Sequence, residues 1–158
     1  NPVGAHESGQ IGQPLEGAAS LVPRALLAVV DPSRRLTVFG TDYPTADGTA
    51  LRDYIHVCDL SRAHLSALEL SKVGHQIFNV GTGRPHSVRE VLAACERATG
   101  QTVAHVDGPR RAGDIHLSAA DPRRFQEATG FVAERGLDDM VASAWRWIQR
   151  NPRGYGSA

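Results

Sequence analysis

The sequence is poor in residues that form cross-links or metal sites. It contains two cysteines, Cys58 and Cys95, which do not form a Cys-x-x-Cys pair. They fall in segments predicted to be a strand end and a helix interior, so we expect buried thiols rather than metal ligands or a disulfide. Its seven histidines show neither His-x-x-x-His nor His-x-x-Glu-His spacing. We therefore predict no metal site. A Gly-x-Ser-x-Gly elbow is also missing, so a hydrolase triad has no anchor.

Long apolar runs and an excess of one charge are missing as well. The longest aliphatic run covers residues 25–30, far short of the roughly 18 to 20 residues of a membrane span, and no charged and apolar leader opens the chain. With 17 basic and 17 acidic residues the formal net charge is zero. No long-range field then favours nucleic acid or an anionic membrane. We expect a cytoplasmic protein with no nucleic-acid or membrane partner.

The chain of 158 residues has the composition of a single globular domain, with 41% hydrophobic residues. Strands are predicted at 36–39, 52–57 and 77–80, and helices at 15–30, 59–70, 87–99, 121–130 and 137–150. Helices and strands alternate, which indicates an α/β fold. The first helix should begin just before Pro23, because a proline in a helix interior removes a backbone donor.

Three helices carry further signals. Asp59 is the expected N-cap of helix 59–70, with an apolar face made by Leu60, Ala63, Ala67 and Leu68. Ser87 and Glu90 have the spacing of a capping box ahead of the next helix. In the last helix, Met140, Val141, Ala144, Trp145 and Ile148 lie on one side. Trp145 and Trp147 are interpreted as a packing face and its rim rather than a base-stacking platform.

Two loops have the composition of anion sites. Gly81-x-Gly83 follows a predicted strand and precedes a helix, as in nucleotide-binding loops. The third glycine of the dinucleotide fingerprint would fall at His86, so a simple strand-to-helix turn is the favoured interpretation. Residues 110–114, Arg-Arg-Ala-Gly-Asp, offer two guanidinium groups as a clamp for a diphosphate, to which Arg52 would add a third positive charge. The alternative for this loop is an ordinary solvated basic surface.

The whole chain resembles one known family. The matching segments are Asn1-Pro2-Val3-Gly4-Ala5-His6, Phe39-Gly40-Thr41-Asp42-Tyr43-Pro44-Thr45 with Asp47-Gly48-Thr49, Arg52-Asp53-Tyr54-Ile55-His56-Val57, Phe78-Asn79-Val80-Gly81-Thr82-Gly83, Arg110-Arg111-Ala112-Gly113-Asp114 and Asn151-Pro152-Arg153-Gly154-Tyr155. They are similar to the UDP-glucose 4-epimerases, which are extended short-chain dehydrogenases/reductases. The resemblance implies that residues 1–158 form the C-terminal UDP-sugar-binding domain, and that the N-terminal NAD-binding Rossmann half is absent from this chain.

The resemblance also implies an activity that this chain does not contain in full. In the family, bound NAD oxidises C4 of a UDP-hexose, the 4-ketose rotates, and the hydride returns to the other face. A tyrosine with a lysine four residues later carries the proton transfer. Here Lys72 is the only lysine and Leu68 precedes it by four, so no catalytic residue is expected in this chain. A homodimer is expected for the full-length protein.

Substrate contacts are carried over position by position. Asn1 would contact the nucleotide sugar, Arg52 and Arg111 the diphosphate, and Asp114 the ribose. The uracil would be lined by Thr37, Val38 and Phe39. Ala19-Ser20-Leu21 replaces the Asn-Asn-Leu of many members in the uridine-contacting helix, so that Ser20 and Leu21 take its place with a shorter contact.

Ser118 departs from the family pattern, because some members have a bulky tyrosine there. A small residue leaves room for a 2-acetamido group, so acceptance of UDP-GlcNAc and UDP-GalNAc is predicted beside UDP-glucose and UDP-galactose. Two alternatives stay open. One is a stand-alone, non-catalytic sugar-nucleotide-binding module. The other is a related nucleotide-sugar dehydratase or decarboxylase, which the Asp-Tyr-Pro-Thr-x-Asp-Gly-Thr turn disfavours.

Overall fold

The computed structural model describes residues 1–14, 17–70 and 74–155. The helices are α1 (Leu21–Val30), α2 (Val57–Leu68), α3 (Val88–Thr99), α4 (Arg123–Thr129) and α5 (Leu137–Arg150). The strands are β1 (Pro2–Val3), β2 (Leu36–Phe39), β3 (Leu51–Asp53), β4 (Ile55–His56), β5 (Pro85–Ser87), β6 (His105–Gly108) and β7 (Leu117–Ser118). The α/β class is confirmed. No helix among these residues is long and apolar enough to cross a membrane.

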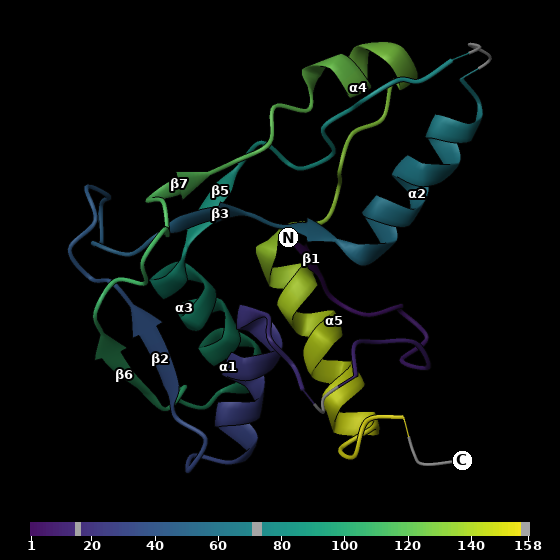
Figure 1. The fold of residues 1–158 in the computed structure, drawn as a ribbon. Coiled ribbons are helices and arrows are strands. Elements are labelled where there is room, and N and C mark those ends of the chain that lie inside the picture. Colours follow the sequence, from purple (N-terminus) through teal and green to yellow (C-terminus); the bar gives the residue numbers. More distant parts are fainter. Residues whose placement is uncertain (15–16, 71–73, 156–158) are drawn as a thin grey trace.

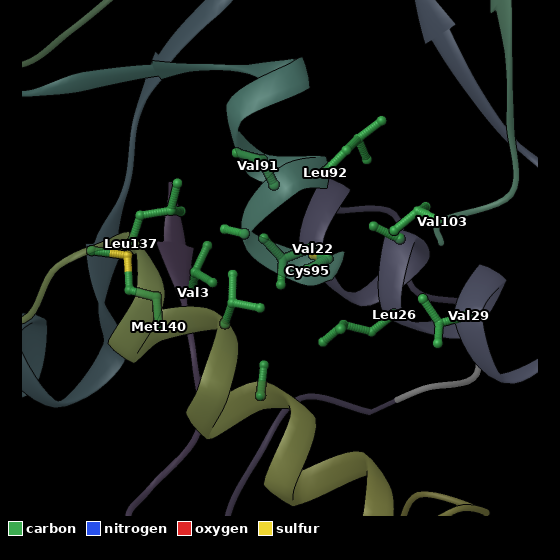
Figure 2. Packing of buried hydrophobic residues seen from close by; sticks show 14 of the residues in the cluster. Val3, Val22, Leu26, Val29, Val91, Leu92, Cys95, Val103, Leu137 and Met140 are labelled. Carbon is green, nitrogen blue, oxygen red and sulfur yellow. The ribbon is translucent and has the colours of Figure 1, made fainter. Parts of the chain in front are cut away.

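Three helices build the main core. α1, α3 and α5 pack together in the lower part of Figure 1 and enclose Val22, Leu26, Val91, Cys95 and Met140 (Figure 2). Each of these side chains is at most 1% exposed, and burying one large aliphatic side chain contributes about 1.5 to 3 kcal/mol. The core fixes the N-terminus of α1 and the start of α3 relative to one another.

The predicted start signals of two of these helices are confirmed. α1 begins two residues ahead of Pro23, in the first turn, where a missing backbone donor costs nothing; Leu15, in the predicted range, lies outside the described residues. In α3, Ser87 Oγ accepts from Glu90 N, and Ser87 N donates to the Glu90 carboxylate. This helix ends at Gly100 in the left-handed conformation, as predicted.

The last helix also follows its prediction, except for its tryptophans. Met140, Val141 and Ile148 are buried, but Trp147 rather than Trp145 occupies the core, at 2% exposure. Trp147 is held there because its indole N–H donates to the Gln13 carbonyl at 2.9 Å. Trp145 packs at the edge of the core.

The described strands form three small sheets. β2 pairs with β6 in parallel, from Leu36 opposite His105 to Phe39 opposite Gly108. β1 pairs in parallel with β4. β3 lies between β5, which is antiparallel to it, and β7, which is parallel. In Figure 1 the β3 sheet runs between the helical core and the pair α2 and α4.

The single strand predicted at 52–57 is wrong, because the segment divides between two sheets. β3 ends at Asp53, Tyr54 belongs to neither strand, and β4 follows beside β1. Val57 already belongs to α2, whose N-cap is His56 rather than Asp59. The imidazole Nδ1 of His56 accepts the Cys58 N–H at 3.0 Å and its Nε2 bonds to Ser143 Oγ at 2.9 Å. Burial, followed by the charge of Arg135, lowers the pKa of His56, so the ring stays neutral.

Asp59 lies in the first turn of α2 and binds the loop between α4 and α5 instead of capping the helix. It is fully buried and accepts from Arg135 Nη1 at 2.6 Å, Arg135 N at 2.9 Å and Glu134 N at 3.1 Å. Burial alone would raise its pKa, but these hydrogen bonds outweigh burial and hold the pKa below its usual value. Asp59 therefore fastens the loop between α4 and α5 to α2.

The apolar face predicted for α2 is only partly buried, and the strand predicted at 77–80 is wrong. Ala63 is buried with Phe125 and Phe131 in a second cluster, but Leu68 is 82% exposed. Residues 77–80 pair with no described strand, and Ile77 is 80% exposed. An apolar run forms a strand only where a neighbouring strand accepts its backbone hydrogen bonds. Helix α4 is confirmed between Pro122 and Gly130.

Both cysteines are free, as predicted. Cys95 lies in the interior of α3 with no exposure, and burial raises its pKa to about 12. Cys58 is half-buried and lies in the first turn of α2 instead of at a strand end.

Candidate substrate-binding cleft

A cleft of about 270 Å³ opens between the start of α1, the strand β2 and the loop after β6. All of the predicted substrate-binding residues except Ser118 line it. They are Asn1, Ser20, Leu21, Thr37, Val38, Phe39, Arg52, Arg111 and Asp114. Residues that are more than 100 positions apart in the sequence thus face one cavity, of a size and mixed polarity suited to a small ligand.

The start of the chain is held at the cleft by β3. Asn1 Nδ2 donates to the Asp53 carbonyl at 2.8 Å, and Val3 is buried in the core. This hydrogen bond engages only the amide N–H of Asn1. Its side-chain carbonyl makes no hydrogen bond to any residue that the structure describes, so it is available as an acceptor.

The N-terminus of α1 forms a second wall. Ser20 is the N-cap residue, but its side chain makes no capping hydrogen bond; its Oγ instead accepts from Gln13 Nε2 at 2.9 Å. Leu21 follows as the first helical residue. The uncapped N–H groups of a helix start favour negative charge or a polar ligand group nearby.

Strand β2 supplies the floor. Val38 is buried, whereas Thr37 and Phe39 are half-buried, as the alternation of a strand requires. The Arg111 guanidinium carbon lies 3.8 Å from the centroid of the Phe39 ring. This cation–π contact holds Arg111 at the cleft, and its N–H groups make no hydrogen bond to another residue that the structure describes.

The positive charge of the cleft comes from a different set of arginines than the loop sequence suggests. Arg52 and Arg111 line it, but Arg110 does not. Arg110 Nε donates to the Asp42 carboxylate at 2.7 Å, and its guanidinium lies 4.3 Å from the centroid of Tyr43. The Arg110–Arg111 clamp is therefore wrong for Arg110, because Asp42 neutralises it and has its own pKa lowered by that hydrogen bond.

Asp114, in the loop before β7, and Ser118, in β7, both lie close to Arg52 of β3. The Asp114 carboxylate lies 3.8 Å from Arg52 Nη2, and Arg52 Nη1 donates to the Leu51 carbonyl at 2.9 Å. The remaining N–H groups of Arg52 and the Asp114 carboxylate are available to a ligand. Ser118 is opposite Arg52 in the register of β3 and β7. Laterally paired residues project on the same face of a sheet. Ser118 is thus on the face of Arg52, exposed and beside the cleft rather than in its lining.

The Gly81–Gly83 loop binds a carboxylate of the protein itself. Asp53 Oδ1 accepts from Thr82 N at 3.1 Å and Thr82 Oγ1 at 2.5 Å, while Oδ2 accepts from Gly83 N at 2.9 Å and Ala120 N at 3.2 Å. A Cβ at Gly81 would lie 2.5 Å from Oδ2, so glycine is required there. Asp53 occupies the donors a phosphate would need, so the interpretation as a turn holds. It is wrong as a strand-to-helix turn, because residues 77–80 are not a strand and β5 follows Gly83.

Two polar residues of the lining, Tyr54 and Arg24, are not identified by the sequence analysis. Burial raises the pKa of Tyr54 to about 12, so its hydroxyl stays protonated and can donate. Arg24 also lines the cleft. It lies four residues after Ser20 and three after Leu21, on the same helical face. That spacing is the signal by which Arg24 could have been found. Among the residues that the structure describes, no group of His, Cys, Asp or Glu side chains could hold a metal ion.

The chain is similar to a known protein family over nearly its whole length. The model of the NAD dependent epimerase/dehydratase family matches residues 1–81. The UDP-glucose 4-epimerase of Neisseria gonorrhoeae is 45% identical over 99% of this chain and 47% of its own length. The crystal structure of the Bifidobacterium longum enzyme in complex with NAD+ and UDP superimposes with a TM-score of 0.90, at 41% identity over 98% of this chain and 47% of that one.

A structure with lower sequence identity to this chain is named for two substrates. The UDP-Glc/GlcNAc 4-epimerase of Campylobacter jejuni superimposes with a TM-score of 0.75, at 34% identity over 95% of this chain and 46% of its own. In every case the chain spans about half the length of the relative it matches.

Proposed function

The chain belongs to the NAD dependent epimerase/dehydratase family, and from that premise we propose that it is the UDP-sugar-binding domain, residues 1–158, of a UDP-glucose 4-epimerase. The observation that carries the proposal is the cleft in which Arg52 and Arg111 converge beside β2. Two guanidinium groups and a floor made by strand β2 match a nucleoside diphosphate, which has an anionic centre and a flat base.

The residues of the cleft bind and orient the substrate in this proposal. Arg52 and Arg111 donate to the diphosphate, Asp114 accepts from a ribose hydroxyl, and Thr37 to Phe39 line the uracil. Ser20 and Leu21 bring the helix start to the uridine, and Asn1 offers its side-chain carbonyl to the sugar. The product would be the C4 epimer of the UDP-hexose.

The cofactor would be NAD, which supplies the reversible oxidation when bound. The described residues do not fit an NAD site, since their Gly-x-Gly turn is occupied by Asp53. We assign NAD and the tyrosine–lysine pair to residues outside this chain; Lys72 itself lies outside the described residues. A homodimeric, cytoplasmic full-length protein completes the proposal.

Neighbouring arginines provide the test. In the full-length protein, Arg111→Met should weaken UDP binding about 10- to 100-fold, as expected for one charge-assisted contact of about 1.5 to 3 kcal/mol. Arg110→Met is the matched control, because Arg110 is paired with Asp42 away from the cleft, and it should change UDP binding less than about threefold. Conversion of UDP-galactose to UDP-glucose and calorimetric UDP binding are the readouts. Equal losses in both variants would contradict the proposed site.

Ser118 supports a second element of the proposal, acceptance of N-acetylated UDP-hexoses. Its small side chain is exposed on the face of Arg52, and a bulky residue there would take up space beside Arg52 at the edge of the cleft. We expect Ser118→Tyr to depress turnover of UDP-GalNAc selectively, with Ser118→Ala as the control that keeps the space. Equal loss of UDP-GalNAc and UDP-galactose turnover would exclude this role.

A further inference from the structure

Arg24 is a cation in the cleft with no partner in the part of the chain that the structure describes. Its side chain is half-buried, lines the cleft, and makes no hydrogen bond or ion pair with another described residue. Arg34, in the adjoining cavity of about 230 Å³, is by contrast paired with Asp31 at 3.3 Å. A half-buried guanidinium loses hydration, which a ligand acceptor can replace.

The position of Arg24 along β2 separates it from the other cationic groups. Arg24 lines both cavities together with Leu36, the first residue of β2. Arg111 stacks on Phe39, the last residue of that strand. At about 3.3 Å per residue the two ends of β2 lie roughly 10 Å apart. If Arg111 holds the diphosphate, Arg24 lies beyond it, at the end of the cleft where the base would be.

The chemistry of Arg24 discriminates between pyrimidines. A guanidinium has only donors. Uracil, like thymine, presents a carbonyl acceptor at position 4, whereas cytosine presents an amino donor there. We propose that Arg24 is a specificity-determining residue that donates to the carbonyl oxygen at position 4 of the pyrimidine and so selects uracil over cytosine. This assignment rests on the proposed function, because it takes the ligand of the cleft to be a nucleoside diphosphate.

Titration of the full-length protein with UDP and CDP tests the assignment. The wild type should bind UDP at least about 10-fold more tightly than CDP, since the 4-amino group of cytosine would face the N–H groups of Arg24 with no acceptor between them. Arg24→Met should weaken UDP about 10-fold and CDP hardly at all, so the ratio collapses. Arg24→Gln, whose amide also accepts, should shift the ratio toward CDP. Arg35→Met is the matched control, because Arg35 lines the adjoining cavity but not the cleft.

The outcomes separate this assignment from the function on which it rests. Equal weakening of UDP and CDP in Arg24→Met would mean that Arg24 acts as a charge for the diphosphate, and would overturn the assignment. An unchanged ratio in a variant that still binds UDP would overturn it as well. Failure of the wild type to bind UDP would overturn the proposed function, and base selection with it.

Discussion

Replacing Asp53 by asparagine removes one charge from a buried site while keeping the shape of the side chain. Asp53 is 6% exposed, and each carboxylate oxygen accepts two hydrogen bonds, all from the segments around Thr82 and Ala120. Asparagine has one acceptor oxygen, so one pair of donors must face its NH₂ group. Isosteric replacement therefore tests the hydrogen bonding without creating a cavity.

The loss of unfolding free energy in Asp53→Asn depends on which of the four donors can find another acceptor. The amide nitrogen is best placed at the position of Oδ1, because the Thr82 hydroxyl can rotate to accept and already lies 3.3 Å from the Arg84 carbonyl. The backbone N–H of Thr82 has no such freedom and is left facing another donor. Losing one hydrogen bond to a charged acceptor and burying one unpaired donor should cost about 2 to 4 kcal/mol.

Urea unfolding of the full-length protein measures this cost. With a slope of about 2 kcal/mol per M, the midpoint should fall by about 1 to 2 M. Asp107→Asn is the matched control, since Asp107 is exposed and pairs only loosely with Arg89, at 3.4 Å; its midpoint should move by less than about 0.5 M. Amide exchange at Thr82 and Gly83 should accelerate in Asp53→Asn alone. Equal midpoints for the two variants would refute the account of the loop.

Three further outcomes follow from buried groups and tight turns. The pKa of Asp59 lies below its usual value of 3.8, so the ionised carboxylate makes its full contribution to the free energy of unfolding above that pH. The difference in urea midpoint between the wild type and Asp59→Asn should therefore close as the pH falls below 3.8. Gly48 and Gly100 both have positive φ, but only a Cβ at Gly48 would overlap a backbone carbonyl. In thermal melts, Gly100→Ala should therefore lower the free energy of unfolding by about 1 to 2 kcal/mol, and Gly48→Ala should lower it by more. Aromatic disulfide reagents at pH 8 should modify Cys58 before Cys95, whose pKa is about 12; faster labelling of Cys95 would contradict its burial.

The elements that could be predicted from sequence are those specified by neighbours in the chain. The capping box of Ser87 and Glu90 is complete within four residues, so α3 begins as predicted, and Gly100 ends it. Pro23 likewise determines where α1 can start. Such signals need no knowledge of the rest of the fold.

The errors arise where distant segments decide the conformation. The segment 52–57 divides because β3 and β4 pair with different sheets, and neither partner is visible from local sequence. Asp59 looks like an N-cap, but a loop 75 residues away supplies its donors. The segment 77–80 has strand composition and no described strand beside it. Arg110 and Arg111 are equivalent in sequence, and only the location of Asp42 separates their roles.

The cleft depends on Asp53 although Asp53 is not part of it. β3 places successive side chains on opposite faces, so Arg52 lines the cleft while the Asp53 carboxylate holds Thr82, Gly83 and Ala120. The backbone carbonyl of Asp53 also accepts from Asn1 Nδ2. Asp53 thus connects the start of the chain, the Gly81–Gly83 turn and the segment after β7, and it directly follows Arg52, which lines the cleft. Weakening it should therefore loosen Arg52 and Asn1 together, so that Asp53→Asn reduces UDP affinity without removing any group from the cleft.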